Sequence, residues 1–459
     1  MTEPLRVAVV GAGPAGIYAS NILQNRASEL GIETQIDLIE SLPAPYGLIR
    51  YGVAPDHPRI KGIVNSLHEM LSSESIRLIG NTHVGKDISL DELRSLYHAV
   101  IFATGAQADA PSSLPGASIP GSFGAADFVS WYDGHPDVPR EWPLDAEEIA
   151  VLGNGNVALD VARVLAKQPH DMLTTDIPEN VYNGLRASAA RDIHLFGRRG
   201  PSQIKFTPIE LRELGEVPGV DIVLDEADFT RADAESEPAM PGNQAKIMAR
   251  ILQSWRERST TGAARRLHLH FWHNPIEILG KDRVSGIRFE RTRLGVNGTL
   301  ENTGETVDYH VQAVYRAIGY HGSPVHEVPF DDVAGVIPND GGRVIDTAGR
   351  WDGLYVTGWI KRGPVGLIGH TKSDASETIE NLLADYRDVT LPERPGSQAV
   401  LALLSQRNVR FTSWEGWLSL DAYERSQGEQ FVGEVHRERI KVVDRDEQVD
   451  LSTAQSVSV

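Results

Sequence analysis

The chain has 459 residues, of which 41% are hydrophobic and 23% charged, with a formal net charge of −19 and no cysteine. This length exceeds what one hydrophobic core usually holds, so we expect two domains or slightly more. The missing cysteine excludes disulfides, thiolate metal sites, Cys-ligated iron–sulfur clusters and thiol catalysis, while the negative charge and the lack of any 18-residue apolar run disfavour nucleic-acid binding and a membrane span.

The first predicted element is an apolar strand that begins by about Leu5, within "LRVAVVGAGPAGIYASNIL", residues 5–23. A glycine-rich turn and a helical pattern follow it. Gly11 suits the tight turn, Gly13 lets the backbone approach a pyrophosphate, and Gly16 allows the helix to pack closely on the sheet. The early strand leaves no room for a targeting peptide, so we expect a cytoplasmic protein.

The next strand is predicted in "IETQIDLIES" and ends at Glu40. An acid at this place accepts hydrogen bonds from a ribose hydroxyl in dinucleotide-binding units. The spacing from Gly11 is longer than the usual ~20 residues, which a longer connecting helix explains. The first unit therefore reads as a dinucleotide site.

A buried strand is predicted in residues 98–106, where it ends at Thr104 and Gly105. The following stretch, "DAPSSLPGASIPGSFGAADF", is rich in Pro, Gly, Ser and Ala and indicates a crossing between domains.

A second strand–turn–helix unit is predicted in "EIAVLGNGNVALDVARVLA", residues 148–166. Gly153, Gly155 and Ala158 take the three fingerprint positions, and alanine is a permitted variant at the third. The Pro, Asp and Asn content of residues 169–191 indicates an inserted loop before the next strand.

That next strand, "DIHLFG", leads into Arg198 and Arg199, where the first unit has an acid. Paired guanidiniums bind a 2′-phosphate through charge-assisted hydrogen bonds. The second site is therefore predicted to take NADP(H) rather than NAD(H). The alternative is that the two arginines form surface ion pairs.

The second domain is predicted to close with a strand in residues 313–324, after which residues 351–386 read as a strand, a glycine-rich turn and a helix that return to the first domain. We predict an α/β protein with two Rossmann-like domains, the first discontinuous and the second inserted into it. The predicted ranges are 1–106 and 331–459 for an FAD-binding domain and 107–330 for an NADP(H)-binding domain. The polar residues beyond about Asp444 predict a mobile tail.

Two dinucleotide domains in one cysteine-free chain imply two redox nucleotides, because a flavin can accept a hydride from nicotinamide and pass on electrons. An acid at the first ribose suits FAD, and the arginine pair suits NADPH. We predict no metal site.

Several stretches together resemble the adrenodoxin-reductase-like ferredoxin-NADP reductases, and the bacterial branch in particular. They are "GAGPAGIYAS", "PYGLIRYGVAPDHPRIK", "GNGNVALDVAR", "FGRRGP", "FTPIELREL" and "GWIKRGPVGLIG". Most flavoproteins with two dinucleotide domains have an aspartate after the strand "GLYVTG", whereas this chain has Trp359, as this family does.

The resemblance implies binding residues for both cofactors. It places FAD at Ala15, Glu40, Leu48, Val84, Trp359, Gly366, Leu367 and Ile368, and NADP(H) at Asn154, Gly155, Asn156, Val157, Arg198, Arg199, Glu210 and the Gly366 backbone. It also implies a polar pair near the flavin, His57 and Glu213, that tunes proton supply or nicotinamide placement. A structural loop histidine and solvated helix acids are the alternatives for these two residues, although Glu213 lies three residues after Glu210 and shares its helix face.

The family also implies a ferredoxin or a similar small acidic electron carrier as partner. An enzyme of net charge −19 must concentrate positive charge locally to dock such a carrier. The candidate surface is residues 246–266, which contain Lys246, Arg250, Arg256, Arg258, Arg265 and Arg266. Ile247, Ile251 and Trp255 are predicted to form the apolar stripe of its helix, and a solvated helix face is the alternative.

Two other functions compete with this reading. A flavin-dependent NADPH monooxygenase also carries two glycine fingerprints, but the Phe-x-Gly-x-x-x-His stretch expected between them is missing. A non-catalytic NADP-sensing module would not need Trp359 or the loop "KRGPVGLIGH", and an absorption spectrum without flavin bands would favour it.

Overall fold

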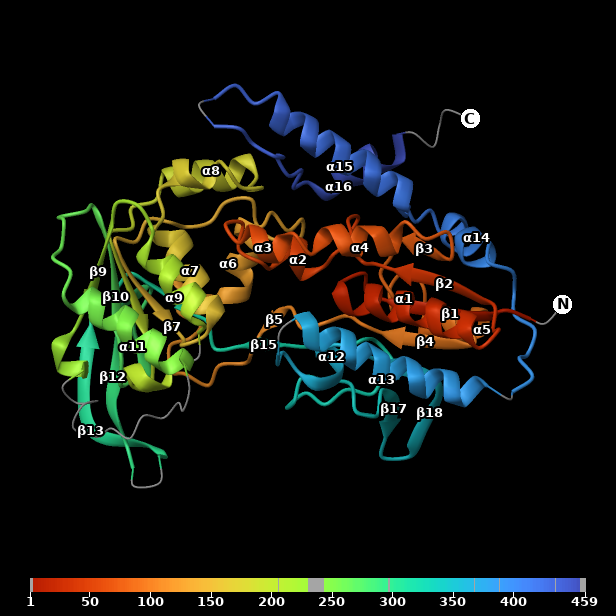
Figure 1. Cartoon of the computed structure of the whole chain (residues 1–459), viewed down its shortest axis with the longest axis horizontal. Helices are drawn as coiled ribbons and strands as arrows, with labels where there is room; N and C mark the ends of the chain where they lie inside the picture. Colours follow the sequence, from red (N-terminus) through yellow and green to blue (C-terminus); the bar gives the residue numbers. More distant parts are fainter. Residues whose placement is uncertain are drawn as a thin grey trace. The chain divides into compact units, whose positions relative to one another are not determined.

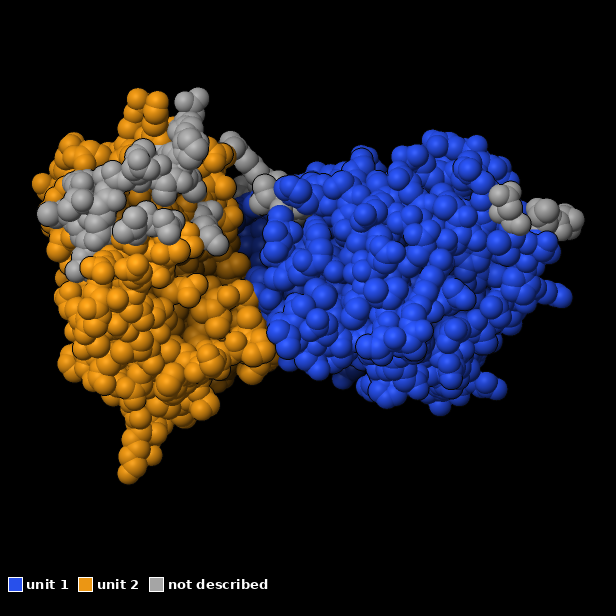
Figure 2. All heavy atoms as spheres, turned by 90° about the horizontal axis from the view of Figure 1, so that it is seen from below, with its two compact units in different colours: residues 1–108, 133–137, 320–459 blue, residues 109–132, 138–319 orange. Residues whose placement is uncertain are grey.

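The computed structural model describes residues 3–204, 206–229, 243–295, 298–366, 368–387, 389–433 and 435–454. The chain forms two compact units (Figure 1, Figure 2). Unit 1 contains residues 1–108, 133–137 and 320–459, and unit 2 contains residues 109–132 and 138–319. Unit 1 is thus discontinuous in sequence. No helix in these described ranges is both long enough and apolar enough to cross a bilayer.

A seven-stranded sheet organises unit 1 in the order β16-β17-β18-β4-β1-β2-β3. Strands β18, β4, β1, β2 and β3 run parallel, and β17 pairs antiparallel with β18 and with the edge strand β16. Val7 and Val9 of β1 contact one hydrophobic cluster and Ala8 and Val10 the other, because alternate side chains point to opposite faces. Burial on both faces explains the continuous apolar run of residues 7–10 in this strand.

The elements assigned to unit 1 have the following bounds: β1 Leu5–Val10, α1 Pro14–Glu29, β2 Thr34–Ile39, α2 Leu48–Tyr51, α3 Pro58–Lys61, α4 Val64–Leu71, β3 Ile76–Ile79, α5 Leu90–Leu96, β4 Ala99–Phe102, β15 Tyr320–His321, β16 Asn339–Asp340, β17 Arg343–Asp346, β18 Gly349–Val356, α12 Trp359–Arg362, α13 Ile368–Tyr386, α14 Ala399–Gln406, α15 Trp414–Glu429 and α16 Arg445–Thr453. Strand β5, Ala108–Asp109, lies where the chain first passes from unit 1 to unit 2.

A six-stranded parallel sheet organises unit 2 in the order β6-β14-β7-β8-β10-β9. A three-stranded antiparallel sheet, β11-β12-β13, packs on one of its faces. Phe289 of β12 stacks on Phe196 of β8 there, with ring centroids 4.2 Å apart. The predicted α/β class with two Rossmann-like sheets is confirmed.

The elements of unit 2 have the following bounds: β6 Ser122–Gly124, α6 Ala125–Tyr132, β7 Glu148–Leu152, α7 Asn156–Ala166, η1 Pro169–Met172, α8 Glu179–Arg186, β8 Asp192–Phe196, η2 Pro201–Gln203, α9 Pro208–Gly215, β9 Val220–Leu224, α11 Asn243–Arg256, β10 Arg265–His270, β11 His273–Gly280, β12 Val284–Leu294, β13 Leu300–Tyr309 and β14 Ala313–Arg316.

Two segments predicted from the sequence to lack regular structure contain helices. Residues 169–191 are not an open loop but contain η1 and α8, because Val181 and Leu185, four residues apart, are both buried. Residues 445–453 of the predicted mobile tail form α16, which Asp444 caps through its side chain and which buries Val449, while residues 455–459 lie outside the described residues. In both segments one or two buried apolar residues secure a helix that is otherwise mostly polar.

Candidate functional site

The carboxyl ends of the parallel strands of unit 1 lie at one edge of the sheet, and the predicted flavin residues follow them. Gly11 follows β1, Glu40 follows β2, and Thr104 and Gly358 come shortly after β4 and β18. The strand order reverses direction between β1 and β4. Open α/β sheets bind their ligands in the crevice at this reversal.

Three glycines shape the loop at that crevice. Gly11 has a φ of +108°, and a Cβ there would lie 2.5 Å from the carbonyl oxygen of Ala103. A Cβ on Gly16 would lie 1.9 Å from the Gly11 oxygen. Gly13 precedes α1 without a side-chain cap, so the first N–H groups of the helix are available to an anion.

Glu40 closes this loop from the end of β2. Its Oε2 accepts a hydrogen bond from the Ala12 N–H at 2.7 Å, and its Oε1 accepts from the Leu42 N–H at 3.0 Å. Burial raises the pKa of the Glu40 carboxyl, although these bonds oppose the rise. Oε1 also accepts from Ser41 Oγ at 3.0 Å, so of the two carboxylate oxygens Oε2 is the one with a second acceptor position left, and the predicted bond to a ribose hydroxyl stays a prediction.

The other residues expected around FAD lie on several elements of unit 1. Ala15 lies on α1, and a Cβ on Gly358 would approach its Cβ to 2.6 Å. Leu48 begins α2, Val84 is buried in a hydrophobic cluster, Trp359 begins α12, Gly366 has a φ of +89°, and Ile368 begins α13. Leu367 lies outside the described residues.

His57 is buried in unit 1, immediately before α3. Its N–H donates to the Ala54 carbonyl at 3.0 Å, and its own carbonyl accepts from Lys61 at 3.1 Å. Glu213 is half-buried on α9 of unit 2. The proposed cooperation of these two side chains stays a prediction.

The second glycine loop, in unit 2, repeats the arrangement of the first. Gly153 follows β7 with a φ of +150°, and a Cβ there would lie 2.5 Å from the Ala317 oxygen, at the end of neighbouring β14. Gly155 precedes α7 without a side-chain cap. Asn156 and Val157 form the first turn of α7, and the Oδ1 of Asn156 is buried without a partner in the described structure.

A cavity of about 640 Å³ opens beside this loop. Gly153, Asn154 and Gly155 line it, together with Arg198 and Arg199 from the end of β8. Both arginines are exposed, and within the described ranges neither guanidinium is paired with a carboxylate. Two unpaired positive charges over a glycine loop are suited to an anionic ligand.

Sequence reasoning missed several residues of the cavity wall. Gln203 lines the cavity and is buried, and its Oε1 has no partner among the described residues. Arg316 also lines it, but its guanidinium donates to the Ala117 carbonyl at 2.9 Å and to Ser122. Gln203 could have been predicted from its position shortly after the arginine pair in "GRRGPSQ". Asn274 reaches the cavity from β11, and no local sequence pattern could have predicted it.

Glu210 has a structural contact that the resemblance did not indicate. It is the third residue of α9, and its Oε2 accepts from the Thr207 N–H at 2.9 Å while Thr207 Oγ accepts from the Glu210 N–H. This capping box stabilises the start of α9. Glu210 does not line the cavity. The spacing T-x-x-E could have predicted the cap.

Only some of the basic residues predicted to form a docking surface, in residues 246–266, are free to contact a partner. Arg266 pairs with Asp192, Arg256 pairs with Glu226, and the buried Arg265 donates to backbone carbonyls of α7 and the residue after it. Lys246 and Arg250 on α11 are exposed. Among the described side chains of α11, Met248, Leu252 and Trp255 are buried. Trp255 thus lies in the buried stripe as predicted, whereas Ile247 and Ile251 are only half-buried.

The chain is similar to known proteins over nearly its whole length. A family model described as pyridine nucleotide-disulphide oxidoreductase matches residues 5–191. NADPH-ferredoxin reductase FprA of Mycobacterium tuberculosis is 38% identical over 440 residues, which cover 93% of this chain and 95% of that protein. The mitochondrial NADPH:adrenodoxin oxidoreductase of Rattus norvegicus is 38% identical over 464 residues, covering 97% and 91%. The solved structure of Mycobacterium tuberculosis FprA in complex with NADPH matches with a TM-score of 0.88 at 36% identity, covering 98% of this chain and 99% of that one.

Proposed function

The chain belongs to the family of NADPH-ferredoxin reductases that includes FprA and adrenodoxin reductase, and from this membership we propose which residues bind each cofactor and which partner accepts the electrons. The resemblance predicted from the sequence is thereby confirmed, and the chain is an NADPH-ferredoxin reductase. We propose that unit 1 binds FAD and unit 2 binds NADP(H). When bound, FAD supplies the acceptor for a hydride from NADPH and releases electrons singly to a carrier.

The residues at the carboxyl edge of unit 1 fit the ADP half of FAD. The uncapped start of α1 offers N–H donors to a pyrophosphate, and Gly11 lets the loop before the helix pass close to the Ala103 backbone. The Oγ1 of Thr104 is buried at the same crevice without a partner in the described structure, so a polar ligand atom there would satisfy it. Glu40 is the residue that would bind the ribose.

The unpaired arginines over the cavity of unit 2 are the observation that carries the assignment of NADP(H). Arg198 and Arg199 would hold the 2′-phosphate, and the start of α7 would receive the pyrophosphate. We assign the nicotinamide-positioning role to His57 and Glu213. The acidic carrier, the ferredoxin-like partner of the family, would dock on positive side chains such as Lys246 and Arg250. The cytoplasmic location stays a prediction.

Flavin reduction and reoxidation test this proposal. The purified protein should show flavin absorption bands, and stopped-flow mixing should reduce them faster with NADPH than with NADH. Adding a ferredoxin should then reoxidise the flavin. A colourless protein that takes up no flavin would support the sensing module instead, and reoxidation by oxygen through a stabilised flavin peroxide would support the monooxygenase.

A further inference from the structure

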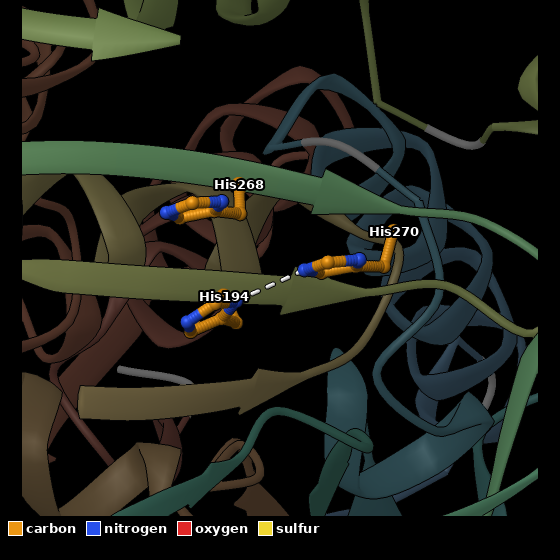
Figure 3. A group of neighbouring side chains, drawn as sticks. All are labelled: His194, His268 and His270. Carbon is orange, nitrogen blue, oxygen red and sulfur yellow. Dashed lines mark hydrogen bonds between the residues drawn. The ribbon is translucent and has the colours of Figure 1, made fainter. Parts of the chain in front are cut away.

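Three histidines gather on one face of the parallel sheet of unit 2 (Figure 3). His194 lies on β8, and His268 and His270 lie two residues apart on β10. The strands pair in parallel with His268 beside His194, so all three side chains point to the same face. One nitrogen of each ring lies within 4.8 Å of the others. The proposed reductase activity uses none of these side chains.

Carboxylates hold the outer nitrogen of two of the rings. Glu148 Oε2 lies 3.0 Å from His194 Nε2, and Asp192 Oδ1 lies 2.6 Å from His268 Nε2. A carboxylate accepts a hydrogen bond, so each Nε2 carries the proton and each Nδ1 keeps its lone pair. The same carboxylate–histidine pairing orients the ligands of metal sites.

The third ring, His270, also has a nitrogen without a hydrogen-bond partner among the described residues. His270 Nε2 lies 2.9 Å from His194 Nδ1 and, because that Nδ1 keeps its lone pair, donates the hydrogen bond between them. His270 Nδ1 is buried and has no partner in the part of the chain that the structure describes. Two of the three ring protons point outward to Glu148 and Asp192, so the nitrogens that face one another carry more lone pairs than protons. Such a group of nitrogens is suited to bind a cation.

We propose that His194, His268 and His270 bind one divalent first-row transition-metal ion such as Zn²⁺, with water in the fourth position. Imidazole nitrogens favour zinc, copper and nickel over magnesium and calcium, and three histidines with one water form a common zinc donor set. This site was not predicted from the sequence. The three histidines do not line the cavity beside the second glycine loop, so the metal site is separate from the nucleotide site.

Binding requires a small rearrangement. The rings of His194 and His268 are stacked, with centroids 4.3 Å apart and planes 18° apart. A metal ion must lie in the plane of each ligand ring, so His268 turns out of the stack when the ion binds. The three side chains are only half-buried, which leaves room for this movement.

Calorimetric titration of Zn²⁺ into chelator-treated holoenzyme, without a polyhistidine tag, tests the proposal. We expect one equivalent bound, and at least a tenfold loss of affinity in His194→Gln and in His268→Gln. His310→Gln, at an exposed histidine of the same unit, is the matched control and should bind as the wild type does.

Spectroscopy on the wild type keeps the test decisive if either variant fails to fold. Bound Cu²⁺ should show electron paramagnetic resonance couplings to three nitrogens, and X-ray absorption should give zinc–nitrogen distances of roughly 2.0–2.1 Å. No stoichiometric binding, fewer than three coupled nitrogens, or folded variants that bind Zn²⁺ as the wild type does would overturn the proposal.

Discussion

Replacing Arg198 and Arg199 together by alanine should remove most of the preference for NADPH over NADH. The two guanidiniums are exposed at the cavity and have no carboxylate partner among the described residues, so their loss leaves no acid unpaired. The variant should therefore fold normally, and its kinetics should report the lost contact to the 2′-phosphate.

The expected magnitude follows from one charged hydrogen bond per arginine. Such a bond contributes about 1.5–3 kcal/mol, and the exposure of both side chains favours the lower value. Two bonds then give about 3 kcal/mol, which is roughly a 100-fold loss of kcat/KM for NADPH at about 1.4 kcal/mol per tenfold. NADH has no 2′-phosphate, so its kcat/KM should change by less than about threefold.

Steady-state kcat/KM with both nucleotides and a chemical electron acceptor measures this preference. Arg191→Ala is the matched control, because Arg191 is an exposed arginine of the same unit whose guanidinium lies 3.8 Å from Glu147. It should leave both kcat/KM values unchanged. A double variant that still prefers NADPH by its original factor would refute the placement of the phosphate.

Three further predictions concern the fold and the flavin site. Gly11→Ala puts a Cβ 2.5 Å from a backbone oxygen and should lower the flavin-to-protein ratio in the absorption spectrum, whereas Gly31→Ala, also at positive φ but with open space around it, should not. Glu424→Ala leaves the buried Arg50 without its carboxylate and should cost about 3–5 kcal/mol in urea unfolding, so an unchanged midpoint would contradict this role. Burial lowers the pKa of His194 from 6.5 to about 4. Between pH 6.5 and about pH 4 the unfolded chain therefore binds more protons than the folded chain, and the free energy of unfolding should decrease as the pH falls through this range. In the presence of a chelator, the melting temperature of His194→Gln should depend less on pH there.

Local patterns predicted the parts of the sites that a short stretch of chain encodes. A strand, a glycine turn and a helix follow one another directly around Gly11 and again around Gly153, so their spacing alone located both loops. The arginine pair was found in the same way, because it follows directly on β8.

The other parts of the sites could not be predicted, because they form where segments that are distant in sequence become neighbours in the fold. Besides the glycine loop and the residues at and after the end of β8, the cavity is lined by residues 111–115, 274–276 and 316–318, and no short pattern links these segments. His194 and His268 are far apart in sequence and meet only because β8 lies next to β10. Glu40 was expected to contact a ligand, and its bonds to the backbone of the glycine loop appear only in three dimensions.

The interruption of unit 1 has a consequence for synthesis on the ribosome. Residues 109–319 contain all of unit 2 and are translated before β18, so the inserted unit can fold first. Until β18 emerges, β4 forms an open edge of a nascent four-stranded sheet, with a row of unpaired backbone groups that can pair with another chain. The protein is therefore most exposed to misassembly during the interval in which the ribosome translates its inserted unit.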